Sequence, residues 1–299
     1  MSSTRGAVVP TYSTTAVRPT TPALIGGAIT ELWSRRSLVR YLVQADLKKK
    51  GADTLLGNLW WVIDPLLQML IYVVLVVVLF QRDQPDYPLF IFAAILPWKW
   101  FTSAINDCIV AVSSQDRLIK QIHFPKIVLP TAAVVAGVVN FVFGLIPLGV
   151  LLLLWYPDRI SANLVFIPVI AAVQFVFTLG IGLILSAINV FYRDVGNISR
   201  HVLRLWFYLS PALYGPATVA AVAKDQPALY QLMQLNPFYT LFTAYRNVIY
   251  GAETPNHSSV PPLAPDWPAL LLLFAGSLVL LAVATTFFKR IEPTFAKVL

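Results

Sequence analysis

Six apolar runs dominate the sequence, and runs of this length restrict the fold to one that crosses a lipid bilayer. An α-helix rises about 1.5 Å per residue, so about 20 apolar residues span a hydrocarbon layer about 30 Å thick. A backbone in lipid must satisfy its own hydrogen bonds, and no alternating ten-residue pattern suggests a β-barrel, so we expect helices. The composition agrees, because 58% of residues are hydrophobic and 12% are charged. The runs are Leu59–Phe80, Leu89–Val112, Ile127–Tyr156, Leu164–Phe191, Val202–Tyr214 with its flanks, and Pro268–Phe288.

The fifth run is the shortest of the six. Ser210 and Pro211 interrupt it, so it reaches spanning length only if the helix starts near Ile198. With it included, the chain is an all-α integral membrane protein with six transmembrane helices.

The Lys and Arg residues gather in segments that an alternating threading puts on one side. Cytoplasmic loops carry an excess of Lys and Arg, so both termini are expected in the cytoplasm and the chain in the plasma (inner) membrane. The net charge of +8 is then a sign of topology, and no basic soluble face suggests a nucleic acid partner. The cytoplasmic set is Arg5, Arg18, Arg35, Arg36, Arg40, Lys48, Lys49, Lys50, Arg117, Lys120, Lys126, Arg193, Arg200, Arg204, Lys289, Arg290 and Lys297. The other side or the spans hold Arg82, Lys99, Arg159, Lys224 and Arg246.

Three regions follow from this pattern. Residues 1–24 are rich in Ser, Thr and Pro and are expected to form a disordered cytoplasmic tail. Residues 25–58 hold an amphipathic helix, with apolar residues at helical spacing from Ile25 to Lys50, followed by a loop. The helix is expected to lie in the cytoplasmic interface of the membrane, in contact with its lipids. Residues 59–299 form the transmembrane domain with its six spans.

The segment Asp225–Gly251 is apolar in part but too interrupted to span. Polar residues and a proline, among them Asn236, Pro237 and Arg246, divide it into short pieces. We therefore expect two short helices that enter the outer leaflet and return before the last span, a geometry tolerated where protein or a water-filled cavity covers the bends.

A short polar segment, Ser113–Lys126, connects the second and third runs. Ser113 or Ser114 can cap a short helix, in which Asp116 and Lys120 suit the two ends and which Pro125 stops. Such a helix in a cytoplasmic loop has two readings: it packs within the chain, or it inserts into a groove on a partner protein.

The motifs of soluble enzymes are missing from the sequence. It contains no phosphate-binding loop, no zinc-binding histidine pair and no nucleophile turn. Its histidines lie far apart, so no metal site, catalytic residue or cofactor bound by this chain is expected. The single cysteine, Cys108, is expected to fill space in the core.

Six short motifs occur in a characteristic order along the chain. Because it carries these motifs in this order, the sequence resembles the permease subunits of type-2 ABC exporters. More narrowly, it resembles their polysaccharide branch, the Wzm and TarG type that exports lipid-linked O-antigen, teichoic acid or cell-wall galactan. The motifs are Asp46-Leu47-Lys48, Leu56-Gly57-x-x-Trp60, Lys120-x-x-x-Phe124-Pro125, Asn189-x-x-Tyr192-Arg193-Asp194, Ser210-Pro211-x-x-Tyr214 and Asn236-Pro237.

The resemblance implies a homodimer of permeases with two copies of a separate ATPase, which alone binds ATP and Mg. It implies that a coupling helix docks on the ATPase, with residues Asp116, Arg117, Lys120, His123, Phe124, Pro125 and Lys126, and that a second contact uses Tyr192, Arg193 and Asp194. It implies a cytoplasmic gate at Asp46, Lys48, Leu56, Gly57 and Trp60, and an outer gate at Asn236 and Pro237, to which we add Arg246.

Asp64 departs from the family pattern, which more often has an amide or neutral residue there. It marks either a polar channel mouth or a cap or interface position.

A lipid-linked polysaccharide carries a diphosphate, and burying one small ion in hydrocarbon costs of order 20 kcal/mol, so the path must be polar. Flat aromatic faces suit passing sugars, although most aromatic residues in spans anchor the protein to lipid or the interface. Lys99 and Asp107 are charged residues inside the second span, where function is the default reading. The candidate channel lining is Trp61, Tyr72, Trp98, Lys99, Trp100, Phe101 and Asp107.

Two other functions remain open at this point. One is export of a drug or small lipid by the same type of transporter. The other is a membrane-embedded enzyme acting on lipid-linked sugars, which would need clustered acidic or histidine residues, whereas Asp64, Asp107 and Asp194 are scattered along the sequence.

Overall fold

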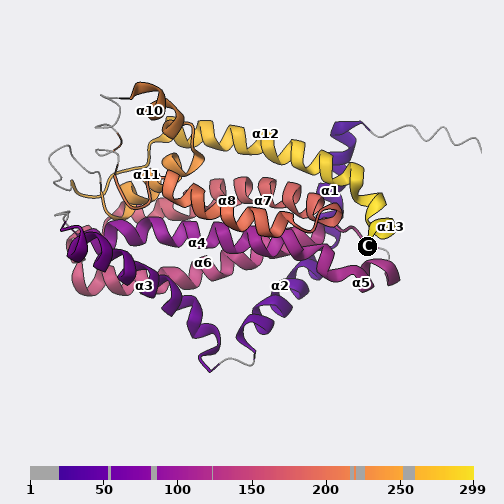
Figure 1. Ribbon diagram of the computed structural model, residues 1–299, viewed down its shortest axis with the longest axis horizontal. Coiled ribbons are helices and arrows are strands. Elements are labelled where there is room, and N and C mark those ends of the chain that lie inside the picture. The colour runs from indigo at the N-terminus through magenta and orange to yellow at the C-terminus, as the bar shows by residue number, and fades with distance from the viewer. Residues whose placement is uncertain are drawn as a thin grey trace, which may run out of the picture.

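The computed structural model describes residues 20–52, 55–81, 86–122, 124–215, 219, 226–251 and 260–299. Its regular elements in these ranges are helical, and no strand occurs among them. Figure 1 shows an elongated bundle whose long helices run along one axis. One end of the bundle carries α1, α5 and α13, and we call it the α5 end; the opposite end carries α10 and α11, and we call it the α11 end.

The helices follow the apolar runs closely. Their bounds are α1 Thr21–Ser34, α2 Arg36–Gly51, α3 Trp60–Val73, α4 Tyr87–Ala111, α5 Asp116–Gln121, α6 Val128–Trp155, α7 Ile167–Phe191, α8 Val195–Leu209, α10 Pro227–Gln234, α11 Pro237–Ile249, α12 Trp267–Ile291 and α13 Phe295–Val298. A π-helical turn, Val74–Leu79, continues α3. Short 3-10 turns are Gly57–Leu59, Ser113–Gln115, Pro157–Arg159, Ala162–Phe166 and Glu292–Thr294.

Five helices in the described ranges are long and apolar enough to cross a membrane: Trp60–Leu79, Tyr87–Ala111, Val128–Trp155, Ala162–Phe191 and Trp267–Val298. This confirms an all-α integral membrane protein. The expected sixth span corresponds to α8, which packs on α4 and α7 but has only 15 residues. At about 1.5 Å per residue its length is about 22 Å, so the count of six spans stays a prediction.

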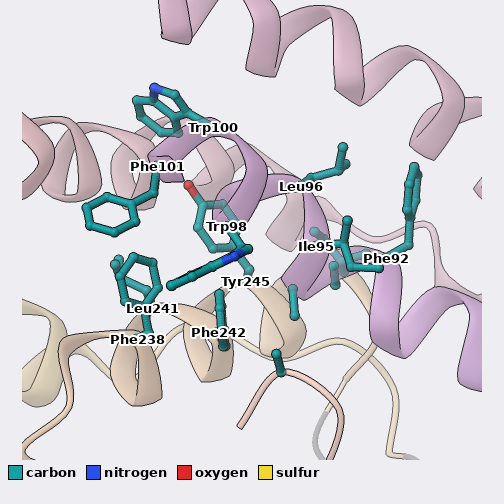
Figure 2. Packing of buried hydrophobic residues seen from close by; sticks show 14 of the residues in the cluster. Phe92, Ile95, Leu96, Trp98, Trp100, Phe101, Phe238, Leu241, Phe242 and Tyr245 are labelled. Carbon is teal, nitrogen blue, oxygen red and sulfur yellow. The ribbon is translucent and has the colours of Figure 1, made fainter. Parts of the chain in front are cut away.

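Helix α4 is the centre of the bundle, because it contacts α3, α6, α7, α8 and α11. Its aromatic side chains pack on those of α11, as Figure 2 shows. The ring centroids of Trp98 and Phe238 are 4.8 Å apart, and those of Phe101 and Phe238 are 4.7 Å apart. This contact joins a long central helix to a short one at the α11 end.

The prediction of one continuous amphipathic helix before the first span is wrong. Two helices, α1 and α2, meet at Arg35, whose φ of −102° and ψ of 19° are not helical. Helix α1 packs against α12, whereas α2 packs against α6. The tertiary contacts therefore explain the break, since one straight helix could not reach both partners. Residues 21–24, expected in the tail, form the first turn of α1, and residues 1–19 lie outside the described residues.

The prediction of two short helices before the last span is confirmed. Helix α10 ends at Gln234 and α11 begins at Pro237, with a turn at Leu235 and Asn236 between them. Helix α11 is largely buried, and its inward residues include Phe238, Leu241 and Phe242. Their position in the outer leaflet stays a prediction.

Two glycines of α7 let neighbouring helices approach closely. A Cβ added at Gly180 would lie 2.9 Å from Leu280 Cγ of α12, and one at Gly182 would lie 2.8 Å from Cys108 Sγ of α4. Cys108 is fully buried and its thiol donates to the carbonyl of Pro130, 3.3 Å away, so it fills the core as expected.

Gly182→Val is expected to destabilise the protein by about 1–3 kcal/mol, because the added methyl groups overpack the contact with Cys108. Thermal unfolding of the purified protein in detergent measures the change. Gly149→Val is the matched control, since a Cβ at Gly149 of α6 meets nothing within 4 Å. Equal melting temperatures for the two variants would contradict this account of helix packing.

Candidate functional site

The α5 end presents a short helix, α5, as the sequence predicts, but its cap differs. No side chain caps α5, and the Ser113 hydroxyl instead donates to the carbonyl of Val110, 3.4 Å away, and accepts from Asn189 Nδ2 at 3.0 Å. Arg117 and Lys120 are exposed, while Ile119 between them is buried and anchors the helix. The helix thus offers a basic outer face on a fixed apolar base.

The residues that follow α5 divide between surface and interior. Asp116 and Pro125 are partly exposed, whereas Phe124 and Lys126 are 7% and 9% exposed. Phe124 packs in an apolar cluster with Ile119 and Phe295. His123 lies outside the described residues. The predicted coupling residues are therefore of two kinds, some available to a partner and some that hold the loop in place.

The predicted second contact lies in the turn between α7 and α8. Tyr192, Arg193 and Asp194 are all exposed there. The hydrogen bond from Asn189, in the last turn of α7, to Ser113 ties this turn to the segment just before α5. Both predicted contacts therefore lie at the α5 end.

The residues predicted as a cytoplasmic gate surround the connection between α2 and α3. Leu56, Trp60 and Lys48 are exposed. Gly57 has a φ of +51°, in the left-handed region that favours glycine. In Figure 1 α2 and α3 leave the side of the bundle and approach each other at this connection.

A charge cluster links α2 to α4 near this connection. Lys50 Nζ lies 2.9 Å from a carboxylate oxygen of Asp46 and 2.7 Å from one of Asp107. Burial opposes the charge of Lys50, but the attraction and hydrogen bonds of Asp107 and Asp46 outweigh it and raise the pKa of Lys50 above its ordinary value. These residues line a cavity of about 470 Å³ between α2, α4 and α6. The sequence pointed to Asp46 and Asp107 separately, and Lys50 is the partner that joins them.

A second cavity, of about 350 Å³, lies between α3, α4 and α6. Trp60, Trp61 and Trp100 line it, and Lys99 of α4 forms an ion pair with Asp64 of α3 at its wall. The Asp64 side chain is 60% exposed and that of Lys99 is 27% exposed, so the pair faces the cavity rather than the core. The ion pair with Lys99 thus accounts for a carboxylate at position 64, where the family more often has an amide or neutral residue.

Other predicted channel residues lie elsewhere. Trp98 and Phe101 are 5% and 0% exposed and belong to the aromatic cluster of Figure 2. Tyr72 is partly exposed and lies beside Phe207, with ring centroids 5.6 Å apart. Packing alone explains the burial of Trp98 and Phe101, and their role in a channel stays a prediction.

At the α11 end, Asn236 caps α11 and joins it to α8. Its Oδ1 accepts from the backbone N–H of Phe238 and from the indole N–H of Trp206, both at 3.0 Å. Its Nδ2 donates to the hydroxyl of Ser210 at 2.8 Å. Pro237 occupies the first position of the helix, where its missing N–H costs nothing. Two motifs separate in sequence therefore meet in one hydrogen-bond network.

Arg246, in the last turn of α11, fastens that helix to the segment that follows α8. It is 3% exposed, and its guanidinium donates to the carbonyl of Pro211 at 2.5 Å, to that of Tyr214 at 3.3 Å and to that of Ala212. The guanidinium carbon also lies 3.6 Å from the ring centroid of Phe90. The sequence marked Arg246 as an interruption of an apolar stretch and as a candidate residue of the outer gate, but its carbonyl partners leave no mark in a sequence. Its role in a gate stays a prediction.

Among the described residues, no three His, Cys, Asp or Glu side chains come together in a group that could hold a metal ion.

The fold and these sites define a multi-pass helical membrane protein, and comparison with known proteins gives its family. Residues 37–250 match the family described as "ABC-2 type transporter". The chain belongs to this family, which confirms its resemblance to type-2 ABC permeases.

Curated relatives cover nearly the whole chain. It is 35% identical over 269 residues, 90% of its own length and 98% of the relative's, to a protein of Myxococcus xanthus named "O-antigen export system permease protein RfbA". It is 27% identical over 264 residues, 88% of its length and 95% of the relative's, to a protein of the same name from Klebsiella pneumoniae.

Arg246→Met is expected to destabilise the protein by more than about 2 kcal/mol, because several buried carbonyl groups lose a charged donor at once. Thermal unfolding in detergent measures the loss. Arg40→Met, at an exposed position of α2, is the control and should unfold near the wild-type temperature. A wild-type melting temperature for Arg246→Met would show that the network at α11 is dispensable.

Proposed function

We propose that this chain is the transmembrane subunit of an ATP-driven exporter that moves a lipid-linked polysaccharide from the cytoplasm across the plasma membrane. The observation that carries the proposal is the 35% identity to an O-antigen export permease over 98% of that protein's length. Similarity of this extent covers the spans, the loops and both ends of the bundle. The O-antigen permease names also favour a glycan over a drug or small lipid as the exported molecule.

The α5 end faces the cytoplasm in this proposal, and so do both termini. Exposed basic residues concentrate there, which fits the excess of Lys and Arg in cytoplasmic segments. Among described residues at the α11 end, Arg159 pairs with Asp86 at 2.9 Å and Arg246 is buried, so neither competes with this orientation.

Two copies of the chain and two copies of a separate ABC ATPase form the transporter. Helix α5 and the turn at 192–194 are the docking surfaces, supported by their exposure at one end of the bundle. ATP and Mg belong to the ATPase. The segment Trp60–Leu79 is the candidate dimer contact, because few of its residues are buried within the chain and its surface is left to lipid or a second copy.

Export then follows from movement of these surfaces. ATP binding closes the two ATPase subunits, which displaces α5 in each permease and opens a path between the two copies. Hydrolysis resets the dimer. This chain carries no step of the hydrolysis; it converts the displacement into an opening.

The two cavities beside α4 are the candidate surfaces for the passing substrate. Each combines charged groups with apolar walls, and the cavity at Lys99 adds the faces of Trp60, Trp61 and Trp100. Aromatic faces contact sugar rings without fixed hydrogen bonds, and ammonium groups suit the diphosphate. The cluster of Lys50 lies near the α5 end, where a lipid-linked substrate would enter.

Reversing the basic face of α5 tests the docking proposal. Arg117→Glu is expected to reduce co-purification of the ATPase about fivefold, because its side chain is exposed and would repel acidic partners. The control is Arg290→Glu, which makes the same change of charge at an exposed position of the same end. Lys120 and Phe124 are unsuited to this test, because Lys120 donates to the carbonyl of Leu299 and Phe124 is buried, so their substitution would also change contacts within the chain. Equal recovery of the ATPase with both variants would contradict docking at α5.

Exchanging the charges of the Asp64 and Lys99 pair tests the transport surface. Asp64→Lys alone and Lys99→Asp alone each place like charges side by side and are expected to lower export about tenfold or more. The double variant restores the ion pair and should recover most of the export. ATPase co-purification is measured beside export in vesicles, and should not change. A double variant no better than either single variant would remove the pair from the transport path.

A further inference from the structure

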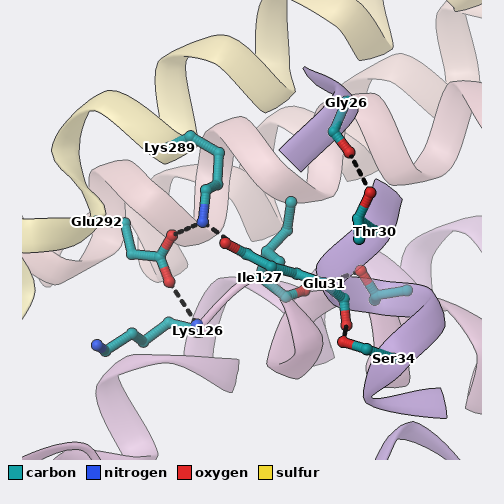
Figure 3. A network of polar contacts seen from close by, with 9 residues as sticks. Gly26, Thr30, Glu31, Ser34, Lys126, Ile127, Lys289 and Glu292 are labelled. Carbon is teal, nitrogen blue, oxygen red and sulfur yellow. Dashed lines mark hydrogen bonds and ion pairs between the residues drawn. The ribbon is translucent and has the colours of Figure 1, made fainter. Parts of the chain in front are cut away.

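A buried carboxylate at the end of the last long helix holds the loop that follows α5. Glu292, directly after α12, is 7% exposed. Its Oε1 accepts a hydrogen bond of 2.5 Å from the backbone N–H of Lys126. Figure 3 shows this contact, with the Lys126 side chain directed away from the carboxylate. The contact therefore depends on the backbone of the loop and not on the identity of its side chain.

The same carboxylate is also connected, through Lys289, to α1. Its Oε2 accepts from Lys289 Nζ at 2.6 Å, and Lys289 Nζ also donates to a carboxylate oxygen of Glu31 in α1 at 2.7 Å. Lys289 is shielded, with 13% of its side chain exposed. Figure 3 shows the path from the loop through Glu292 and Lys289 to α1. Three successive contacts thus connect the loop, the end of α12 and α1, although Lys126 and Glu292 are 166 residues apart in the sequence.

Lys126 lies in the loop that connects α5 to α6. It precedes the first turn of α6, where backbone N–H groups lack partners within the helix, and no side chain of α6 itself caps that end. A carboxylate near the positive end of a helix is favoured electrostatically. On the other side of the loop, Phe124 packs in the cluster that also holds Phe288 and Phe295. The loop is therefore held to the C-terminal end of α12 by the apolar contact of Phe124 and by the hydrogen bond of the Lys126 N–H to Glu292.

We propose that Glu292 is a positioning residue, which makes the loop after α5 move together with α12 and α1. This rests on the proposed function, in which an ATPase displaces α5. A loop free to bend would absorb that displacement locally. A loop fastened through its backbone to two further helices passes the displacement to the rest of the bundle.

Removing the carboxylate should let the loop after α5 move without α12 and α1, while the docking surface on α5 stays in place. In Glu292→Ala the N–H of Lys126 loses its partner and Lys289 keeps only Glu31. The exposed residues Arg117 and Lys120 are unchanged, so the ATPase still binds and hydrolyses ATP. The expected defect is one of coupling: hydrolysis continues, and less of it results in export.

The experiment uses the permease and ATPase complex reconstituted in lipid vesicles, with two readouts. The first is amide hydrogen exchange at Lys126, which is expected to rise at least about tenfold in Glu292→Ala, because a buried hydrogen bond to a charged acceptor is lost. The second is export per ATP hydrolysed, measured with a fluorescent oligosaccharide on a polyprenyl diphosphate. It is expected to fall about fivefold or more, the lower end of coupling between linked sites.

Asp266→Ala is the matched control. Asp266 also accepts from a backbone N–H at the start of a helix, that of Ala269 at 3.3 Å, but it lies at the opposite end of α12. It is expected to leave both readouts at their wild-type values. If Glu292→Ala does not assemble, Glu292→Asp, which keeps the charge but shortens the side chain, is expected to shift both readouts in the same direction.

Unchanged exchange at Lys126, or faster exchange with wild-type export per ATP, would overturn the proposal. So would hydrolysis and export that fall in equal proportion, which is the result of a stability defect alone. Failure of the wild-type complex to export the probe would contradict the proposed function instead, and the exchange readout still decides whether Glu292 holds the loop, because it does not involve transport.

Discussion

Charged groups inside an apolar bundle need partners within the protein, and the connections between the helices of this bundle depend on how those partners are found. An unpartnered polar group buried away from water costs several kcal/mol. Each of the charged residues discussed above inside a span or a buried turn meets this demand: Lys99 with Asp64, Asp107 with Lys50, Arg246 with backbone carbonyls, and Glu292 with Lys289 and a backbone N–H. These contacts determine which helices are fastened together, and therefore which can move as one.

The two ends of the bundle use such contacts differently. At the α11 end, Asn236 and Arg246 fasten α11 to α8 and α4, so a gate there would have to move these elements as a unit. At the α5 end, α5 exposes Arg117 and Lys120, although Lys120 Nζ also donates to the carbonyl of Leu299 at 2.6 Å, and the loop behind α5 is tied to α12 and α1. This arrangement suits a subunit that receives movement at one end and opens toward the other.

Sequence alone predicted the elements well, because long apolar runs and short motifs are local signals. It predicted the five bilayer-length helices of the described residues, the two short helices before the last of these five, and the short helix at 116–121. It could not predict the break at Arg35, which follows from α1 and α2 packing on different partners, or the pairing of Lys50 with Asp107, which lie 57 residues apart. Nor could it separate Trp98, which is buried by packing, from Trp60, which lines a cavity, since both are aromatic residues in apolar surroundings.

The central claim is that this chain forms a conduit opened by a separate ATPase. Its most direct test is ATP-driven appearance of a labelled lipid-linked oligosaccharide on the far side of vesicles that contain the purified chain and its ATPase. The account predicts transport that requires both proteins and stops with an ATPase unable to hydrolyse ATP. Transport by the chain alone, or none with both proteins present and hydrolysis running, would contradict it.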